Sequence, residues 1–384
     1  MTKKKKDTKS IDLAAQSGAA YEVVHRYGFA SKEHLVSYSG VDNENGRKLA
    51  RGLKKIAESK INEDYASQNI KQQAGFSAEV KYTARQNAEK IISGSKEKYY
   101  RTDDLGHVND PLVDHVLLDE DGRIVLGSSE QMKFVGNSPK ACLNKLVSKE
   151  FQKYIDADNK ITVPHDFYQD VFQEAETRIQ FLQQQLDRAN SSGNQELADK
   201  LKKKIAKYNK IRSLIRDSGI TNKEAKEARQ HPKLSIAKDI ARISHRAGVE
   251  QAKTGAFVGG GISLIKNTIS VIKGETEPFD AAKAVALDIG QGAIVGYTTA
   301  FVGSTLKAGM QNASNSTIRA ISKTNAPAMI VTSTIDLGKS MTRFVKGQIS
   351  GVELLEEVGE KGTGHISSAM FAIYGAQNEA YNIE

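Results

Sequence analysis

The sequence is poor in cysteine, which limits both its redox chemistry and its metal chemistry. Cys142 is the only cysteine among 384 residues. An internal disulfide and a zinc site built from several cysteines are therefore excluded. Such a chain is compatible with the reducing cytoplasm, which is the location that we expect.

Secretion and nucleotide-binding motifs are lacking as well. The N-terminus, MTKKKKDTKS, has a basic run with no apolar segment behind it, so we expect no Sec signal peptide. The triple glycine at 259–261 matches neither a Walker A loop, which needs Gly-Lys-Ser/Thr, nor a dinucleotide fingerprint. The chain also has no internal repeat of fixed period.

The composition that is present indicates folded domains with a basic surface. Hydrophobic residues make up 39% and charged residues 26%, which excludes disorder of the whole chain. The length suggests two or three domains. Lys and Arg number 55 against 46 acids, a net charge of +9. This surplus favours a polyanionic partner, either nucleic acid or an anionic membrane surface.

Four stretches differ in composition and set the expected domains. Residues 1–70 form a polar, helical N-terminal region with a basic tail, and residues 71–165 contain the only convincing strand patterns. Residues 166–250 are charged and helical, and residues 251–384 are rich in Gly and Ala.

The third stretch predicts a coiled-coil-like helical hairpin. Two amphipathic stripes flank the polar break at 190–194, so two helices should pack against each other in antiparallel fashion. The outer face is basic and includes Lys202, Lys203 and Lys204. These lysines either contact phosphates or form an ordinary solvated helix face. The apolar stripes contain Val171, Ala175, Ile179, Leu182, Leu186, Leu197, Leu201, Ile205 and Tyr208.

Residues 76–94 predict one amphipathic helix, with Ser77 as its cap and Gly94 as its stop. Glu79 stands beside the apolar stripe, where an acid can point toward a sheet edge. The alternative is an ordinary acid near a helix N-terminus, favoured by the helix dipole.

A β-hairpin follows, because the Asp-Gly pair at 121–122 separates two apolar runs. A two-residue turn there would place Asp114 opposite Ser129 and Asp110 opposite Lys133. Since side chains alternate along a strand, Gln131 and Lys133 should share the face of Asp114.

The surrounding pattern completes an order of helix, three strands, helix and strand. A weaker strand pattern at 98–102 precedes the hairpin. Ser138 and Pro139 begin a helix that should run to about Tyr154, and residues 160–163 resemble a short strand.

This arrangement resembles the core of the PD-(D/E)XK nuclease superfamily over residues 75–165. Pro111 and Asp114 match the first half of its motif, and Gln131-Met132-Lys133 the second. Glu79 matches an additional helix acid that many members have. Two departures are that proline and aspartate are not adjacent, and that glutamine replaces the second acid, as it does in some branches of the superfamily.

The resemblance implies a restriction-endonuclease-like core and a metal-dependent nuclease. Glu79, Asp114 and Gln131 would bind Mg²⁺, or Mn²⁺ as a substitute, and Lys133 would complete the catalytic set. DNA is the favoured substrate over RNA, and the domain combination suggests bacterial antiviral defence or conflict between bacteria. The alternative for these residues is a solvent-side hairpin with incidental charges.

The C-terminal stretch adds a second hypothesis. Residues 289–306 contain no charge, and Gly292 and Gly296 have GxxxG spacing, near the lower limit for a membrane-spanning helix. Polar side chains dilute this segment, so we favour a soluble bundle over membrane association. The competing function is a non-enzymatic membrane-active or scaffolding protein, and the helical regions leave homo-oligomerisation open. The expected fold class is thus α+β: the nuclease-like core, the helical hairpin and a glycine-rich helical C-terminal region.

Overall fold

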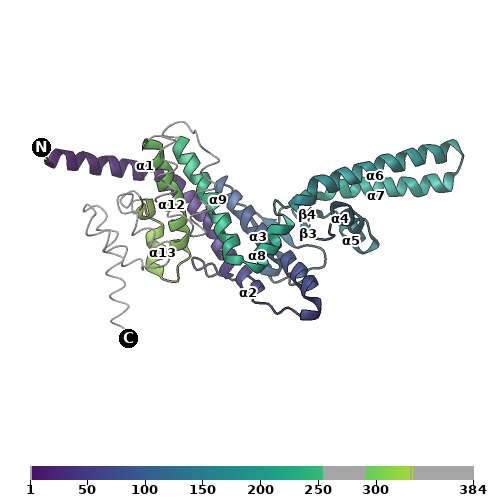
Figure 1. Ribbon diagram of the computed structural model, residues 1–384, viewed down its shortest axis with the longest axis horizontal. Helices are drawn as coiled ribbons and strands as arrows, with labels where there is room; N and C mark the ends of the chain where they lie inside the picture. Colours follow the sequence, from purple (N-terminus) through teal and green to yellow (C-terminus); the bar gives the residue numbers. More distant parts are fainter. Residues whose placement is uncertain (1, 254–290, 329–330, 332–384) are drawn as a thin grey trace. The chain divides into compact units, whose positions relative to one another are not determined.

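The computed structural model describes residues 2–253, 291–328 and 331 (Figure 1). Internal contacts divide the chain into two compact units, each of which joins segments distant in sequence. Unit 1 consists of Met1–Arg47, Ile91–Ser95 and Lys233–Glu384, and unit 2 consists of Lys48–Lys90 and Lys96–Pro232. The four stretches defined by composition stay a prediction.

Unit 2 is built on a mixed five-stranded sheet, and the α+β class is therefore confirmed. The strands lie in chain order, with antiparallel pairing among the first three and parallel pairing among the last three. The predicted order of helix, three strands, helix and strand is present. The strands are β1 (Lys98–Arg101), β2 (His115–Leu118), β3 (Glu130–Met132), β4 (Lys160–Val163) and β5 (Ile215–Asp217).

Helices cover both faces of this sheet. One face packs on α3 and α8 through a cluster that includes Tyr82, Met132 and Ile220. The other face packs on α4–α7 through a larger cluster that includes Leu143 and Ile161. The helical elements of unit 2 are α2 (Leu53–Ala57), η1 (Glu63–Tyr65), α3 (Ala66–Ile92), η2 (Thr102–Leu105), α4 (Pro139–Leu146), η3 (Lys149–Phe151), α5 (Gln152–Asp156), α6 (His165–Ser191), α7 (Gln195–Leu214) and α8 (Asn222–Gln230).

Helix α3 is longer than its sequence pattern predicts. It begins at Ala66, so the prediction of Ser77 as a cap is wrong. The Ser77 hydroxyl instead donates to the carbonyl of Gln73, 3.0 Å away, inside the helix. The first turns of α3 are polar and partly exposed. The apolar stripe in the sequence therefore begins several residues after the helix does.

The register of the predicted β-hairpin is wrong, although its faces are right. Near the turn, Leu118 pairs with Ile124 around a three-residue loop, whereas His115 pairs with Glu130. The register differs between these two pairs, because extra residues at 127–129 form a bulge in the second strand. Asp114 therefore lies beside Gln131 and not opposite Ser129, since its backbone N–H donates to the carbonyl of Glu130.

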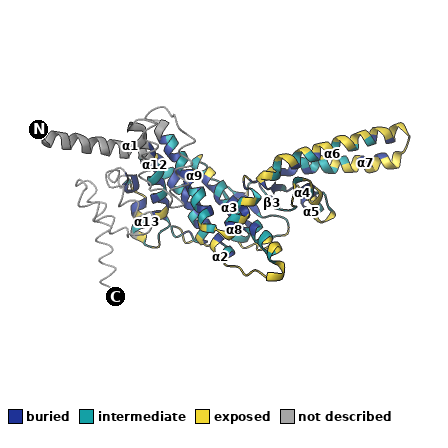
Figure 2. Ribbon diagram, viewed as in Figure 1, coloured by how far each residue is buried: buried dark blue, intermediate teal, exposed yellow. Residues whose placement is uncertain are grey.

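The hairpin of α6 and α7 has the predicted break between its helices, and the two helices lie side by side in Figure 1. Its base belongs to the core of the sheet, through Val171 and Ile211. Its outer half is held by a separate small cluster around Leu186 and Leu201. Figure 2 shows that this outer half is exposed along its length. The strand β5 directly after α7 was not predicted from the sequence.

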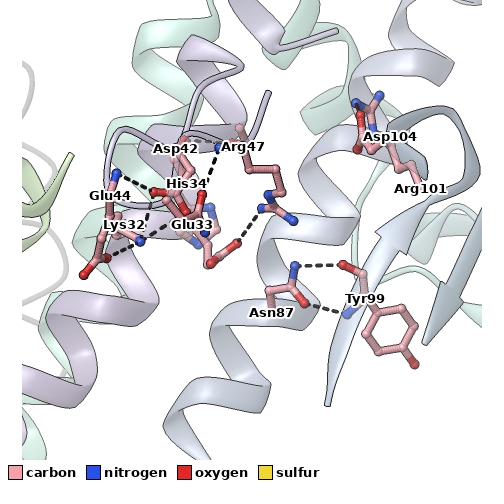
Figure 3. A network of polar contacts seen from close by, with 12 residues as sticks. Lys32, Glu33, His34, Asp42, Glu44, Arg47, Asn87, Tyr99, Arg101 and Asp104 are labelled. Atoms are coloured by element: carbon pink, nitrogen blue, oxygen red, sulfur yellow. Dashed lines mark hydrogen bonds and ion pairs between the residues drawn. The ribbon is translucent and has the colours of Figure 1, made fainter. Parts of the chain in front are cut away.

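Two sets of polar contacts, shown in Figure 3, fix β1 within unit 2. The guanidinium of Arg101 donates to Asp104 from two nitrogens, at 2.6 and 2.9 Å, with both side chains 3% exposed. The side chain of Asn87 exchanges two hydrogen bonds with the backbone of Tyr99, at 2.7 and 3.0 Å. These contacts tie β1 to α3 and to the turn that follows β1.

Unit 1 is helical in the residues that the structure describes, and α1 packs along α12. Beyond α1 the chain turns through a buried ionic cluster, in which Lys32 binds Asp42 at 3.2 Å and Glu44 at 2.6 Å (Figure 3). Lys323 also binds Glu44 at 3.3 Å. The helices of unit 1 are α1 (Thr2–Ser39), α9 (Pro232–Lys253), α12 (Gln291–Gln311) and α13 (Ser316–Ser322).

Much of the glycine-rich region predicted at 251–384 lies outside the described residues, and so do the surroundings of Gly292 and Gly296. In the described part, glycine permits close helix packing. A Cβ at Gly303 would lie 2.8 Å from a methyl group of Val24, and one at Gly248 would overlap the ring of Tyr297. None of the helices that the structure describes is long and apolar enough to cross a membrane.

The contact at Gly248 gives a stability prediction for unit 1. The rigid Tyr297 ring leaves no room for a methyl group, so Gly248→Ala should lower the free energy of unfolding by about 1–3 kcal/mol. Gly309→Ala is the matched control, because its Cβ would meet open space. It should be neutral or stabilising, by up to about 1 kcal/mol. Denaturant unfolding of both variants measures the difference, and equal effects would contradict the packing described here.

Candidate functional site

The predicted site residues start with Asp114, which directly precedes β2. One carboxylate oxygen accepts a hydrogen bond from the backbone N–H of Met132, at 2.7 Å, and another from the side-chain amide of Gln131. Asp114 and Gln131 therefore lie on the same face of the sheet, as predicted. Burial raises the pKa of Asp114 to about 6, although the positive charge of Lys133 acts against this rise.

Gln131 lies in the middle of β3 and is 3% exposed. Its amide nitrogen serves Asp114, but its carbonyl oxygen is buried with no hydrogen-bond partner among the described residues. A buried acceptor without a donor costs about 1–3 kcal/mol. The site thus contains a buried carbonyl oxygen, that of Gln131, which no donor among the described residues reaches.

Lys133 follows β3 and lies on the same face. Its ammonium stands over the ring of Tyr154 from α5, 4.8 Å from the centroid. Its backbone N–H donates to the carbonyl of Thr162, at 2.8 Å, so the start of this side chain is fixed to β4. The charge of Lys133 acts to lower the pKa of both Asp114 and Glu79.

Glu79 reaches the site from α3. Burial, and next the negative charge of Asp114, raise the pKa of Glu79 to about 8. The positive charges of Arg101 and Lys133 oppose this rise. The charges of Asp114 and Lys133 thus act on the helix acid. Among these four residues, the hydrogen bond from Gln131 to Asp114 is the direct side-chain contact that the structure describes. Their chemical roles stay a prediction.

The opposite face of the same strands carries a different polar group. The hydroxyl of Tyr82 donates to Glu130 at 2.7 Å, and the rings of Tyr82 and His115 meet edge to face. Glu130 and His115 thus face α3, away from Gln131, as the alternation predicted. Burial lowers the pKa of His115 to about 3, so this imidazole is neutral near pH 7. Burial also raises the pKa of Cys142 to about 12, which leaves its thiol protonated and a poor nucleophile.

Two other aspartates near the site have structural partners. Asp103 accepts hydrogen bonds from Arg51 at 3.1 Å and from the backbone of Asn109 at 2.9 Å. Asp110 does not pair with Lys133 as predicted. Its carboxylate instead accepts two backbone N–H groups of residues 112–113, in a local turn.

Arginines close to the site were missed by the sequence argument. Arg101 influences the pKa of Glu79, and its guanidinium also donates to the carbonyl of Arg51 at 2.9 Å. An arginine at the end of a short, weak strand pattern gives no sign of this role. The usable signal was the i,i+3 spacing to Asp104.

The donor set fits a hard divalent cation. Mg²⁺ prefers carboxylate and carbonyl oxygens, and Glu79, Asp114 and Gln131 offer these. Gln131 has a buried oxygen without a partner among the described residues, and burial raises the pKa of both carboxyls, so a bound cation would stabilise their charged forms. The described residues include no group of three or more His, Cys, Asp and Glu placed to hold a metal. The present set has two carboxylates and an amide.

The raised pKa of Glu79 predicts an unusual pH dependence of stability for the metal-free protein. Between the ordinary value of 4.5 and about 8, the folded state holds a proton that the unfolded chain releases. The free energy of unfolding should therefore fall as the pH rises through this range. Glu79→Gln should flatten the profile and be the more stable protein at pH 8.

Denaturant unfolding in EDTA at a series of pH values checks this prediction. Glu63→Gln is the control, because Glu63 is exposed on η1 of the same unit and should leave the profile unchanged. A wild-type profile that rises between these pH values, or a Glu79→Gln profile parallel to it, would contradict the assignment of Glu79.

Comparisons of this chain with protein-family models, with curated proteins and with solved structures found no match. Its function is therefore inferred from its residues and their geometry.

Proposed function

We propose that this protein is a metal-dependent nuclease that hydrolyses phosphodiester bonds of DNA. The observation that carries the proposal is the pairing of Asp114 with Gln131 on one sheet face, with Lys133 two residues further along. The order of elements around them supports a restriction-endonuclease-like core, of the kind that the PD-(D/E)XK resemblance implies. The excess of basic residues supports a polyanionic substrate.

Asp114 and Glu79 would hold the cation through their carboxylates, and Gln131 through its side-chain carbonyl. Half a turn of the Gln131 amide exchanges its nitrogen and oxygen, which directs the buried oxygen toward the Asp114 side. Neighbouring carboxyls with raised pKa release protons when a cation neutralises their repulsion, so cation affinity should increase with pH. When bound, the metal supplies a water of lowered pKa and a positive charge beside the phosphate.

Lys133 supplies the positive charge that this chain itself brings to the reaction. Its ammonium can donate to a non-bridging phosphate oxygen, which gains negative charge in the transition state. The Tyr154 ring and the backbone bond to Thr162 restrict its position. A charge held in place before the substrate arrives stabilises the transition state more than one that must be ordered during the reaction.

The test is incubation of the purified protein with supercoiled plasmid, linear DNA and RNA, in parallel with Mg²⁺, with Mn²⁺ and with EDTA. We expect DNA cleavage with either metal and none with EDTA. Asp114→Asn protein, purified identically, controls for contaminating nucleases. Absence of cleavage of every nucleic acid by the wild type, or equal cleavage by the Asp114→Asn protein, would overturn the proposal.

A further inference from the structure

The outer face of α7 carries a row of lysines that the site does not use. Lys200, Lys203, Lys204, Lys207 and Lys210 recur at three- and four-residue spacing, which places them on one side of the helix. The buried residues Ala198 and Leu201 lie on the other side, whereas Ile211, nearer the base of the hairpin, falls in line with the row and packs into the core of the sheet. We call the five lysines the lysine row. It extends over about 15 Å of helix.

Three members of this row have no acidic partner among the residues that the structure describes. Lys200 pairs with Glu196 at 2.6 Å, and Lys210 binds Asp158. Lys203, Lys204 and Lys207, between them, have no hydrogen bond or ion pair in the described part of the chain, and α7 has no acid after Asp199. The centre of the row therefore has positive charge that the described residues leave without a paired acid.

Apart from Lys210, which binds Asp158, the row makes no hydrogen bond or ion pair with other elements of unit 2 in the described residues. The outer half of the hairpin is held by contacts between α6 and α7 alone, around Leu186, Leu201 and their neighbours. Lys203 and Lys204 are exposed. The partner helix α6 has more acids than bases, so the positive charge is confined to one side of the hairpin.

We infer that the lysine row binds the phosphate backbone of double-stranded DNA, as a second contact surface of this nuclease. Lysine acts as a point charge toward phosphate, and such contacts position a duplex without reading its sequence. A single strand would need aromatic rings for base stacking. The row has none, because Tyr208 packs against the core of the sheet. The inference rests on the proposed function in taking DNA as the substrate.

Binding is measured without cleavage, by fluorescence anisotropy of a labelled duplex in EDTA across a salt series. The triple variant Lys203→Gln/Lys204→Gln/Lys207→Gln should bind about tenfold more weakly or worse at low salt. The slope of log affinity against log salt should become shallower by about 1 for each lysine that no longer neutralises a phosphate, about 3 in all. The matched control is Lys54→Gln/Lys55→Gln/Lys60→Gln, which removes the same charge from exposed lysines of the same unit.

A loss of affinity in the triple variant, with wild-type affinity in the control, supports the surface. Equal losses in both variants, no loss in the triple variant, or no binding by the wild type would overturn it. Tighter binding of the row to anionic phospholipid vesicles than to duplex would overturn it also. Unfolding curves test whether the three substitutions, at exposed Lys203 and Lys204 and half-buried Lys207, leave the fold intact. Because Asp114→Asn should still bind the duplex, a failed cleavage assay and a failed binding assay are distinguished.

Discussion

Lys133→Ala and Asp114→Asn should each lower the rate of magnesium-dependent DNA cleavage about a hundredfold or more. The first change removes a positive charge that lowers the pKa of both carboxyls, and the second removes a ligand charge. Asparagine keeps a carbonyl oxygen in place of the carboxylate, so the N–H groups of Gln131 and Met132 retain an acceptor. Single-turnover cleavage of plasmid measures both effects.

The matched control is Lys153→Ala. Lys153 also stands over the ring of Tyr154, 4.9 Å from its centroid, but its charge is not among the main influences on the pKa of either carboxyl of the site. Each lysine substitution removes one cation–π interaction worth about 0.5–1 kcal/mol, so the stabilities of the two variants should be similar. Lys153→Ala should cleave DNA at about the wild-type rate, whereas Lys133→Ala should be about a hundredfold slower or more. Wild-type activity in Lys133→Ala and Asp114→Asn together would refute the assignment of the site.

The second large effect concerns stability. Arg101→Met should lower the free energy of unfolding by about 3–5 kcal/mol, because it leaves the carboxylate of Asp104 buried without its ionic partner. The double variant Arg101→Met/Asp104→Leu also removes the unpaired carboxylate of Asp104 and should recover much of this loss of stability. Denaturant unfolding of the two single variants and the double variant completes a double-mutant cycle.

Arg123→Met provides the contrast. Its guanidinium binds Asp121 at 2.8 Å at the tip of the β-hairpin, where the two side chains are 77% and 58% exposed. Solvent screens such a pair, so the loss should be below about 1 kcal/mol. Similar losses for Arg101→Met and Arg123→Met would contradict the importance given to burial. Arg101→Met should also raise the pKa of Glu79 further, since the arginine charge opposes that rise.

The sequence predicted which side chains share a sheet face, but not which residues pair across the β-hairpin. The bulge at 127–129 displaced the expected pairing of Asp114 by two residues, from Ser129 to Gln131. A displacement of two preserves the alternation of side chains, so the expected face survived a wrong register. A displacement of one residue would have placed Gln131 beside Tyr82 and removed it from the site.

Other features depend on contacts that local patterns do not encode. Strand β5 is three residues long, which is too short to show an alternation of apolar and polar side chains. It forms by pairing with β4. The joining of residues 1–47 with residues after 232 in unit 1 follows from the packing of α1 on α12. The proximity of Glu79 to Asp114 likewise requires the crossing of α3 over the sheet, which no spacing within either segment specifies.

The position of the α6–α7 hairpin between two paired strands has a consequence for how unit 2 folds. Strands β4 and β5 are parallel neighbours, so the chain between them must return to the edge at which it started. Closing an unstructured loop of that length costs entropy before any strand contact forms. Contacts between α6 and α7 are local and can form within microseconds, which brings the ends of β4 and β5 together beforehand. We therefore expect the hairpin to form before β5 pairs with β4, which shortens the loop that this pairing must close.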